Sequence, residues 1–224
     1  MFQSRALSFC SGDQQDGGHR SGHSRTNGIY VATDVLYGIV NAVSRINGTA
    51  RRCVEDFGVA IINDISARTL DDRMFETIAR LQVPYIAMHM KGSPQTMMED
   101  TDYANLMQEI LLHFAGKVTQ LHQMGVNDIW IDPGFGFSKT TAQNYRILDK
   151  LEEFHIFELP VLVGFSRKTM IRDVLATTPA ESLNGTTALN MYALTKGAHI
   201  LRVHDVKEAV QTVRLYNTIN NTDV

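Results

Sequence analysis

Polar side chains capable of binding or catalysis follow several short apolar runs in this sequence. An amide, a carboxylate and three basic side chains hold these positions: Asn63, Asp132, Lys168, Arg202 and His204. If the runs are parallel strands, their carboxyl ends open into one ligand crevice. An amide and a carboxylate can read the edge of a heterocycle, whereas Arg and Lys bind phosphate groups. The sequence therefore predicts a site for a small ligand that carries a heterocycle and an anionic group.

Asp132 ends the apolar run Ile129–Asp132. A carboxylate at this place is costly to bury unless it accepts hydrogen bonds, and a paired amino and imino edge of a ligand supplies two. The alternative is that Asp132 caps the turn that follows. A nucleotide-binding P-loop is disfavoured here, because Ser138 stands where that motif needs glycine before the lysine.

Two other strand ends have structural alternatives. Asn63 can read a heterocycle, but Asp64 and Ser66 directly after it can equally satisfy the backbone of a polar turn. Met88 and His89 end the next run. A lone histidine is more often structural than catalytic, and the methionine fits the core as well as a pocket.

Arg202 and His204 alternate with Val203 in the last predicted strand. Alternation places the two basic side chains on one face, which faces the active site if the strand belongs to a barrel. Together they form an anion clamp, in which the arginine offers a bidentate fork to phosphate. The alternative is that Arg202 pairs with a carboxylate of a neighbouring strand.

Strand-like runs alternate with helical patterns from about residue 59 onward. The predicted strands are Val59–Asn63, Tyr85–His89, Ile129–Asp132, Val161–Gly164 and Ile200–His204. The first predicted helix is capped by Thr69 or Asp71 and ends at Val83-Pro84. The other predicted helices are Tyr103–Met124, Asn144–Phe154, Lys168–Leu175, Thr186–Lys196 and Val206–Tyr216. Nearly continuous apolar strands are typical of a parallel sheet covered on both faces. This order predicts an α/β fold of the TIM (β/α)8 type, incomplete or divergent at its N-terminus.

Composition describes an ordinary globular chain. Of 224 residues, 44% are hydrophobic, and the net charge of −3 gives no general attraction to nucleic acid or to an anionic membrane. Cys10 and Cys53 lie too far apart and too isolated to indicate a disulfide framework or a zinc site. With no signal peptide or membrane-spanning run, we expect a cytoplasmic protein.

The first fifty residues differ from the rest. Residues 11–27 are rich in Gly, Ser, Gln and His without periodicity, which predicts loop or disorder, and residues 29–43 fit one strand or one helix. We therefore divide the chain into a divergent segment, 1–50, and a barrel domain, 51–224. The abrupt change near Thr49 suggests a mis-called start or a frameshift upstream of it.

Five motifs in order resemble those of the dihydropteroate synthase family, across roughly residues 51–215. They are Asn63-Asp64-Ile65-Ser66, Met88-His89-Met90, Asp132-Pro133-Gly134-Phe135-Gly136-Phe137, Gly164-Phe165-Ser166-Arg167-Lys168 and Arg202-Val203-His204-Asp205. The resemblance implies a TIM barrel, usually a homodimer, that acts in folate biosynthesis and is a sulfonamide target. The family's N-terminal motifs, which include a metal-holding Asn and two substrate-covering loops, have no counterpart here.

The resemblance also implies roles for the pterin-binding residues. Asn63 and Asp132 are expected to hydrogen-bond the pterin ring, and Met88 and Phe137 to line its slot. Lys168 is expected to reach the ring and to border the channel for p-aminobenzoate.

The remaining roles concern the other substrate and the leaving group. Thr169 is expected to contact the benzoate carboxylate, and Arg202 and His204 to hold the pyrophosphate. Lys168, Arg202 and His204 are the predicted catalytic residues, and Arg167 is expected to be structural.

The implied reaction joins 6-hydroxymethyl-7,8-dihydropterin pyrophosphate to p-aminobenzoate, giving 7,8-dihydropteroate and pyrophosphate. Mg2+ is the implied cofactor, although no metal ligand is identifiable in this sequence. Two alternatives remain: a pterin-binding pseudo-enzyme, and a pterin-dependent methyltransferase on the same barrel. The basic cluster formed by Lys168, Arg202 and His204 favours the synthase, because a methyltransferase needs no pyrophosphate clamp.

Overall fold

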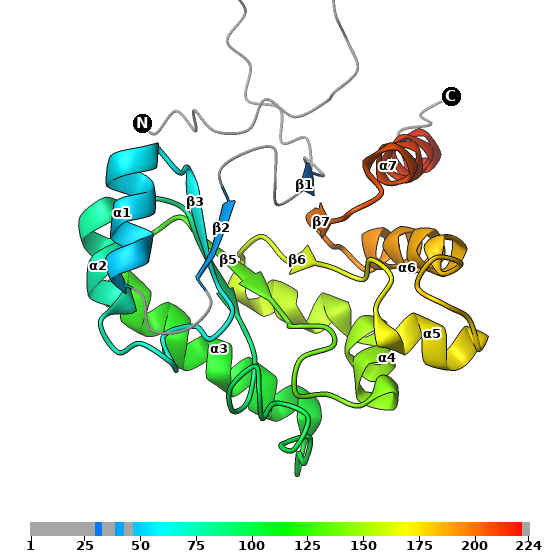
Figure 1. Cartoon of the computed structure of the whole chain (residues 1–224), viewed down its shortest axis with the longest axis horizontal. Coiled ribbons are helices and arrows are strands. Elements are labelled where there is room, and N and C mark those ends of the chain that lie inside the picture. Colours follow the sequence, from blue (N-terminus) through cyan, green and yellow to red (C-terminus); the bar gives the residue numbers. More distant parts are fainter. Residues whose placement is uncertain (1–29, 33–38, 43–46, 221–224) are drawn as a thin grey trace, which may run out of the picture.

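The computed structural model describes residues 30–32, 39–42 and 47–220 as helices around a core of parallel strands (Figure 1). The strands are β1 (Tyr30–Ala32), β2 (Ile39–Ala42), β3 (Ile61–Asp64), β4 (Tyr85–Met88), β5 (Ile129–Asp132), β6 (Leu162–Val163) and β7 (Ile200–Arg202). The helices are α1 (Asn47–Phe57), α2 (Met74–Leu81), α3 (Leu106–Gln123), α4 (Thr141–Asp149), the 3-10 helix η1 (Leu151–Phe157), α5 (Thr169–Leu175), α6 (Leu183–Thr195) and α7 (Val206–Asn220).

All the strand pairs are parallel. One sheet has the order β2-β3-β4-β5 and the other β1-β7-β6, and a parallel bridge between Ile131 and Val161 joins β5 to β6. The strands thus follow one another in a single curved series, with β2 and β1 at its two ends. Among the described residues, no pairing joins these two ends. The predicted parallel α/β architecture is confirmed, while a closed eight-stranded barrel is not shown.

The inner face of this series begins with a layer of apolar side chains. One residue from each of five consecutive strands, β3 to β7, forms a separate buried cluster: Ile61, Ile86, Trp130, Leu162 and Ile200. Side chains two residues apart share a strand face. The next residues on the inner face are therefore Asn63, Met88, Asp132, Gly164 and Arg202. The alternation predicted for Arg202 and Val203 is confirmed, because Val203 packs in the other core, against the helices.

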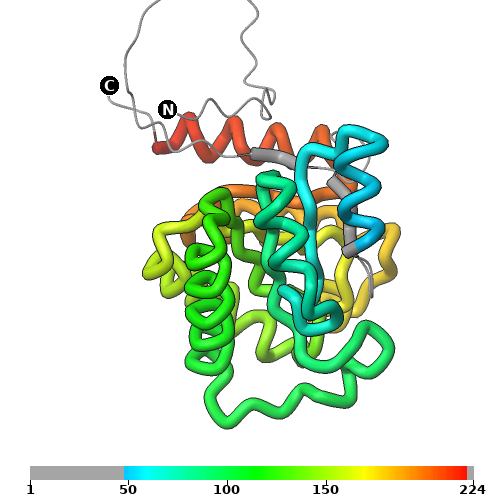
Figure 2. Tube along the Cα trace, turned by 90° about the vertical axis from the view of Figure 1, so that its left-hand side faces the viewer, coloured from blue at the N-terminus to red at the C-terminus, as the bar shows by residue number. Residues whose placement is uncertain are grey.

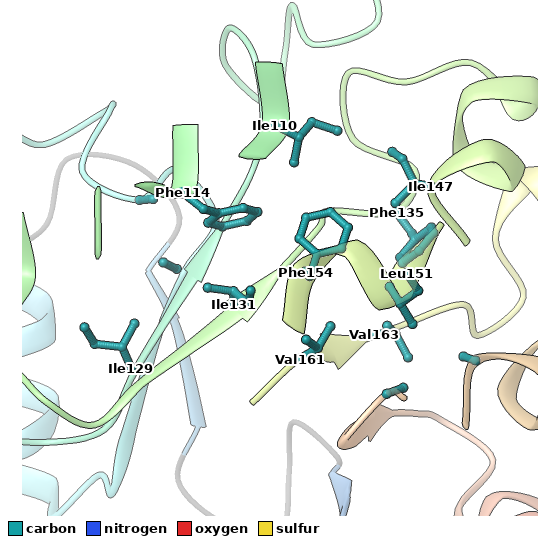
Figure 3. Packing of buried hydrophobic residues seen from close by; sticks show 14 of the residues in the cluster. Ile110, Phe114, Ile129, Ile131, Phe135, Ile147, Leu151, Phe154, Val161 and Val163 are labelled. Carbon is teal, nitrogen blue, oxygen red and sulfur yellow. The ribbon is translucent and has the colours of Figure 1, made fainter. Parts of the chain in front are cut away.

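The larger core fills the space between the strands and the helices (Figure 3). Phe114 of α3 stacks edge-to-face on Phe154 of η1, with ring centroids 5.9 Å apart, beside Ile131 of β5. Phe114 has no exposed surface, whereas Leu112 on the same helix is 64% exposed. Helix α3 thus has one apolar stripe towards the sheet, as its sequence spacing predicts.

The helices pack as neighbours around the strands. Helices α1 and α2 lie side by side, as do α6 and α7 (Figures 1 and 2). Gly125 and Gly197 follow the ends of α3 and α6 and adopt φ of +79° and +84°, which a glycine allows at little cost. Among the described residues, no helix is long and apolar enough to cross a membrane.

Four sequence predictions need correction. Residues 29–43 contain two strands, β1 and β2, rather than one strand or one helix. Helix α1, over Asn47–Phe57, was not predicted. Helix α2 is not capped by Thr69 or Asp71, because its N-cap is Arg73 and no side chain caps it. The helix predicted over residues 144–154 consists of two elements, α4 and η1. The loop predicted over residues 11–27 lies outside the described residues.

We expect Phe114→Ala to lower the free energy of unfolding by about 3–5 kcal/mol, because it leaves a cavity between α3, η1 and β5. Leu112→Ala on the same helix is the matched control and should change stability by less than about 0.5 kcal/mol. Urea denaturation of both variants measures the difference. Similar midpoints for the two would contradict this description of the core.

Candidate active site

The end of β3 is held by a buried carboxylate. Asp64 accepts hydrogen bonds from the Ser66 amide at 2.9 Å, the Ser66 hydroxyl at 2.7 Å, the Arg68 amide at 2.8 Å and the Tyr85 hydroxyl at 2.7 Å. The structural alternative for this turn is thus correct for Asp64 and Ser66. Asn63 faces the other side of the strand and is 1% exposed. The turn fixes the position of the Asn63 amide within the inner layer.

Tyr85 joins this turn to the neighbouring strand. Its ring is fully buried and packs edge-to-face on Phe75, with centroids 5.8 Å apart. Burial, with the charge of Asp64, raises the pKa of the Tyr85 hydroxyl well above its usual value, so the hydroxyl remains a donor. β4 and the β3 turn are therefore tied by a charge-assisted hydrogen bond inside the core.

Asp132 combines both roles considered for it. Its Oδ1 accepts the Gly134 amide at 2.8 Å, which caps the turn, while the side chain lies on the inner face and is 5% exposed. Burial raises the pKa of the carboxyl, and the charges of Lys168 and Arg202 act against that rise. A carboxylate has two oxygens, so turn capping leaves it able to accept further hydrogen bonds.

The loop after Asp132 requires unusual backbone conformations. Gly134 has φ +73°, and a Cβ there would lie 2.1 Å from the His89 carbonyl oxygen. Ser138 adopts φ +48° and is fully buried, at the position where a P-loop would have glycine. Its hydroxyl donates to the Phe137 carbonyl at 2.8 Å and accepts the Lys91 amide at 2.9 Å. These hydrogen bonds offset the strain of a left-handed serine.

Lys168, the N-cap residue of α5, extends over this loop. Its ammonium donates to the Phe135 carbonyl and lies 5.1 Å from the centre of the Phe137 ring. The stem packs over Gly136, where a Cβ would lie 3.2 Å from Lys168 Cδ. Burial lowers the pKa of Lys168 to about 8, against the attraction of Asp132. A strand-end lysine therefore faces the inner site, as the sequence predicts.

Met88 and Phe137 belong to one apolar cluster. Met88 is buried in it with Ile65 and Met90, and the partly buried Phe137 packs against them. Met88 is also the register partner of Asp132 in the neighbouring strand. The predicted slot residues are thus brought together beside the predicted hydrogen-bonding group.

His89 faces away from the slot. It is 3% exposed, and its ring lies against His113, Tyr103 and Phe114, with the His113 centroid 4.9 Å away. Burial lowers the pKa of His89 to about 2, so the ring is neutral at physiological pH. The structural alternative for this histidine is correct.

The basic residues of the last strand occupy the adjoining part of the site. Arg202 packs beside Gly164, where a Cβ would lie 3.5 Å from Arg202 Cβ. The backbone amide of His204 donates to the Ser166 hydroxyl at 3.1 Å, and the His204 side chain is exposed. The segments that follow β6 and β7 are thus tied together beside Lys168 and Arg202, and the role predicted for the His204 side chain stays a prediction.

Arg167 is a structural tie, as the sequence suggests. Its guanidinium donates to both carboxylate oxygens of Asp205 at 3.1 and 2.9 Å, and to the carbonyls of Pro179 and Ala180 at 2.7 Å each. The nearby Arg167 guanidinium lowers the pKa of Asp205. Because Arg167 and Asp205 directly adjoin Lys168 and His204, this fork fixes two predicted site residues relative to each other.

Thr169 is the first residue of α5. It is exposed at the start of α5, and its hydroxyl accepts a hydrogen bond from Arg172 at 2.7 Å. Its predicted role with the benzoate carboxylate stays a prediction.

A hollow of about 540 Å³ lies elsewhere, between α3, α4 and η1. It is lined by Asn105, Met107, Gln108, Leu111, Leu112, Ala115, Arg146, Lys150, Glu153, Ile156 and Phe157. It includes no strand-end residue, so we do not assign the candidate site to it.

Sequence reasoning missed two residues that shape the site. Tyr85 was assigned only to an apolar strand, although a tyrosine in a buried run needs a partner for its hydroxyl. Lys139 was considered only as part of a P-loop, yet it is buried beside Asp132. A lysine directly after an apolar turn was the only signal for it.

A family model described as "Pterin binding enzyme" matches residues 44–204, which is most of the chain and includes every strand-end residue named above. The chain belongs to the pterin-binding enzyme family. It is 42% identical over 160 residues to a dihydropteroate synthase from Escherichia coli, covering 70% of this chain and 56% of that protein. A Haemophilus influenzae dihydropteroate synthase is 35% identical over 183 residues, covering 80% and 66%.

Solved structures of dihydropteroate synthases align with most of this chain. A Yersinia pestis dihydropteroate synthase in a sulfonamide drug complex aligns with a TM-score of 0.75 at 34% identity, over 81% of this chain and 66% of that one. A Thermus thermophilus dihydropteroate synthase in complex with 4-aminobenzoate aligns with a TM-score of 0.76 at 31% identity, over 81% and 70%. This pterin-binding chain spans a little over half the length of the Escherichia coli relative.

We expect Tyr85→Phe to lower the free energy of unfolding by roughly 1–3 kcal/mol, because the buried Asp64 carboxylate loses a donor. Tyr192→Phe is the matched control, since its hydroxyl donates to Asp149 at 3.0 Å on the exposed surface and its loss should matter little. Chemical denaturation compares the two. Equal losses in the free energy of unfolding would show that the buried hydrogen bond stabilises the fold no more than the exposed one.

Proposed function

We propose that this chain is a dihydropteroate synthase of folate biosynthesis. The observation that supports this most strongly is the proximity of the Asp132 carboxylate to Lys168 and Arg202, which are close enough for their charges to act on it. One site therefore combines a hydrogen-bond acceptor for a heterocycle with cations for an anionic group. The relatives named dihydropteroate synthase in the same family support the same reaction.

The pterin ring is proposed to lie in the slot between Met88 and Phe137. Asn63 and Asp132, on the inner faces of β3 and β5, then hydrogen-bond its polar edge. An amide supplies a donor and an acceptor, and a carboxylate accepts the paired amino and imino groups. The buried surroundings strengthen these bonds because little water competes for them.

The proposed reaction forms a bond from the p-aminobenzoate nitrogen to the pterin methylene carbon. The bond from that carbon to the pyrophosphate oxygen breaks, its electron pair leaves with pyrophosphate, and the amine proton passes to water. Arg202 and His204 stabilise the departing anion, and Lys168 binds beside the pterin ring. Thr169 is assigned to the benzoate carboxylate. This chemistry depends on positioning and electrostatics more than on a base.

Mg2+ is not part of the proposed steps. Among the described residues, no cluster of three or more His, Cys, Asp or Glu side chains is arranged to hold a metal ion. Mg2+ is commonly held by one or two protein oxygens together with substrate phosphates, so its requirement stays a prediction of the family resemblance. Homodimer formation, a cytoplasmic setting and inhibition by sulfonamides are proposed on the same ground.

The decisive test is pyrophosphate release by the 224-residue chain, supplied with the pterin pyrophosphate, with and without p-aminobenzoate and Mg2+. We expect release that needs both substrates and falls at least about a hundredfold in Lys168→Ala, because the lysine contacts the site and not the core. Lys207→Ala, an exposed change on α7, is the control and should retain activity. Thermal denaturation should show little change for either variant.

Other outcomes identify the alternatives. Pterin binding without pyrophosphate release would make the chain a pseudo-enzyme. Equal losses of thermal stability and activity in Lys168→Ala would count against the assigned role of the lysine.

The rate should also fall as the pH rises through about 8, where Lys168 loses its proton. Below that pH the ammonium is charged and binds beside the ring, and above it the charge is lost. We expect kcat/KM to decline about tenfold per pH unit above this value. Lys168→Arg is the control, because the arginine stays charged over this pH range while any ionisation of the substrates affects both enzymes equally. An identical decline in that variant would assign the pH dependence to another group.

A further inference from the structure

Lys139 is the one lysine or arginine that is buried in the part of the chain that the structure describes. It is 2% exposed. A buried ammonium is costly unless each N–H has an acceptor and an opposite charge lies near. The hydrogen bonds that offset the cost of burying the Lys139 ammonium therefore identify the segments that this side chain holds together.

The Lys139 ammonium has three acceptors, and all are backbone carbonyls. Its Nζ lies 3.3 Å from the oxygen of His89, 3.1 Å from that of Gly134 and 2.9 Å from that of Phe137. A protonated lysine has three N–H donors, so acceptors and donors match in number. The first carbonyl follows β4, and the other two belong to the loop after β5.

The same loop is held from two other elements. Asn144 of α4 accepts the Gly136 amide at 2.7 Å and donates to the Lys139 carbonyl at 3.2 Å. Lys168, at the start of α5, donates to the Phe135 carbonyl. Lys139 therefore joins the β5 loop to the end of β4, the strand that carries Met88, together with the hydrogen bond from the Lys91 amide to the Ser138 hydroxyl.

We propose that Lys139 is a positioning residue for pterin binding: by fixing the loop 133–138 against the end of β4, it sets Asp132 and Phe137 at the separation that the ring requires. This inference rests on the proposed function. Lys139 itself is not assigned a contact with substrate. Its effect passes through the loop, which carries the Gly134 amide that caps Asp132 and the Phe137 ring that lines the slot.

The charges around Lys139 fit this role. Asp132 on β5 is the acidic group that attracts it, whereas Lys168 and Lys91 repel it, and His89 and His113 are neutral neighbours. Burial lowers the pKa of Lys139 to about 7, and Asp132 acts against that shift. The ammonium thus also helps to keep the Asp132 carboxylate ionised.

The test compares Lys139→Met with the unsubstituted chain. Trp130 is the single tryptophan and lies two residues before Asp132, so quenching of its fluorescence by 6-hydroxymethylpterin reports binding. We expect pterin affinity, and the KM for the pterin substrate, to worsen by about tenfold or more, with kcat changed much less. Hydrogen exchange of the 133–138 amides should accelerate while that of residues 206–220 stays unchanged.

The control is Val118→Ala, which removes core methyl groups from α3. It should lower stability and leave pterin affinity within about twofold. Unchanged affinity in Lys139→Met, or an equal loss in the control, would overturn the proposal. If Lys139→Met does not fold, Lys139→Gln is the second variant, because it keeps two N–H donors on a shorter chain.

A third measurement needs no variant. In the unsubstituted chain labelled with 15N-lysine, the proposal predicts a slowly exchanging ammonium signal for Lys139 below its pKa of about 7, because three carbonyls accept its buried donors. Rapid exchange of that ammonium would overturn it. No pterin binding by the unsubstituted chain would instead overturn the proposed function, and hydrogen exchange in Lys139→Met would then decide separately whether the lysine orders the loop.

Discussion

The central constraint in this structure is the two-residue alternation of side chains along parallel strands. It places an apolar layer inside the strands, represented by Trp130 and Ile86, and directly above it a polar layer that includes Asp132. The apolar layer excludes water from below, so charges in the polar layer act on one another strongly. The raised pKa of Asp132 and the lowered pKa of Lys168 both follow from this arrangement.

Charged side chains around this layer are held in place by backbone partners. Asp64 is offset by two amides and two hydroxyls, and Lys139 by three carbonyls. Arg167 uses both a carboxylate and two carbonyls. In each case a single side chain holds loops from different strands, which is how a set of short strands can position a site to within a hydrogen-bond length.

Backbone strain collects at the same loops. Arg167 and Ser138 adopt φ of +55° and +48°, which costs energy for residues other than glycine. Both are held by several hydrogen bonds, and both adjoin residues assigned to ligand binding, Lys168 and Phe137. Strain offset by local hydrogen bonds is typical of binding loops whose geometry is fixed before the ligand arrives.

The sequence by itself determined the parallel α/β class, five strand positions to within two residues, and the identity of the strand-end residues. It could do so because buried parallel strands leave a continuous apolar run, and the residue that ends each run is visible in it. Helix α1 was missed because its many polar residues obscure the apolar helical periodicity. The division of residues 29–43 into β1 and β2 was missed because strands of three or four residues leave only a short apolar run.

Only the tertiary structure decided which strand-end residues share the site. His89 and Met88 are adjacent in sequence, yet one faces aromatic rings of the outer core and the other faces Phe137. The tie made by Lys139 was equally hidden, because its three acceptors are backbone carbonyls, two near in sequence and one fifty residues away. The residue types in a sequence identify the side chains that can bind a ligand. Every residue has a backbone carbonyl, however, so only the fold decides which carbonyls a buried ammonium will contact.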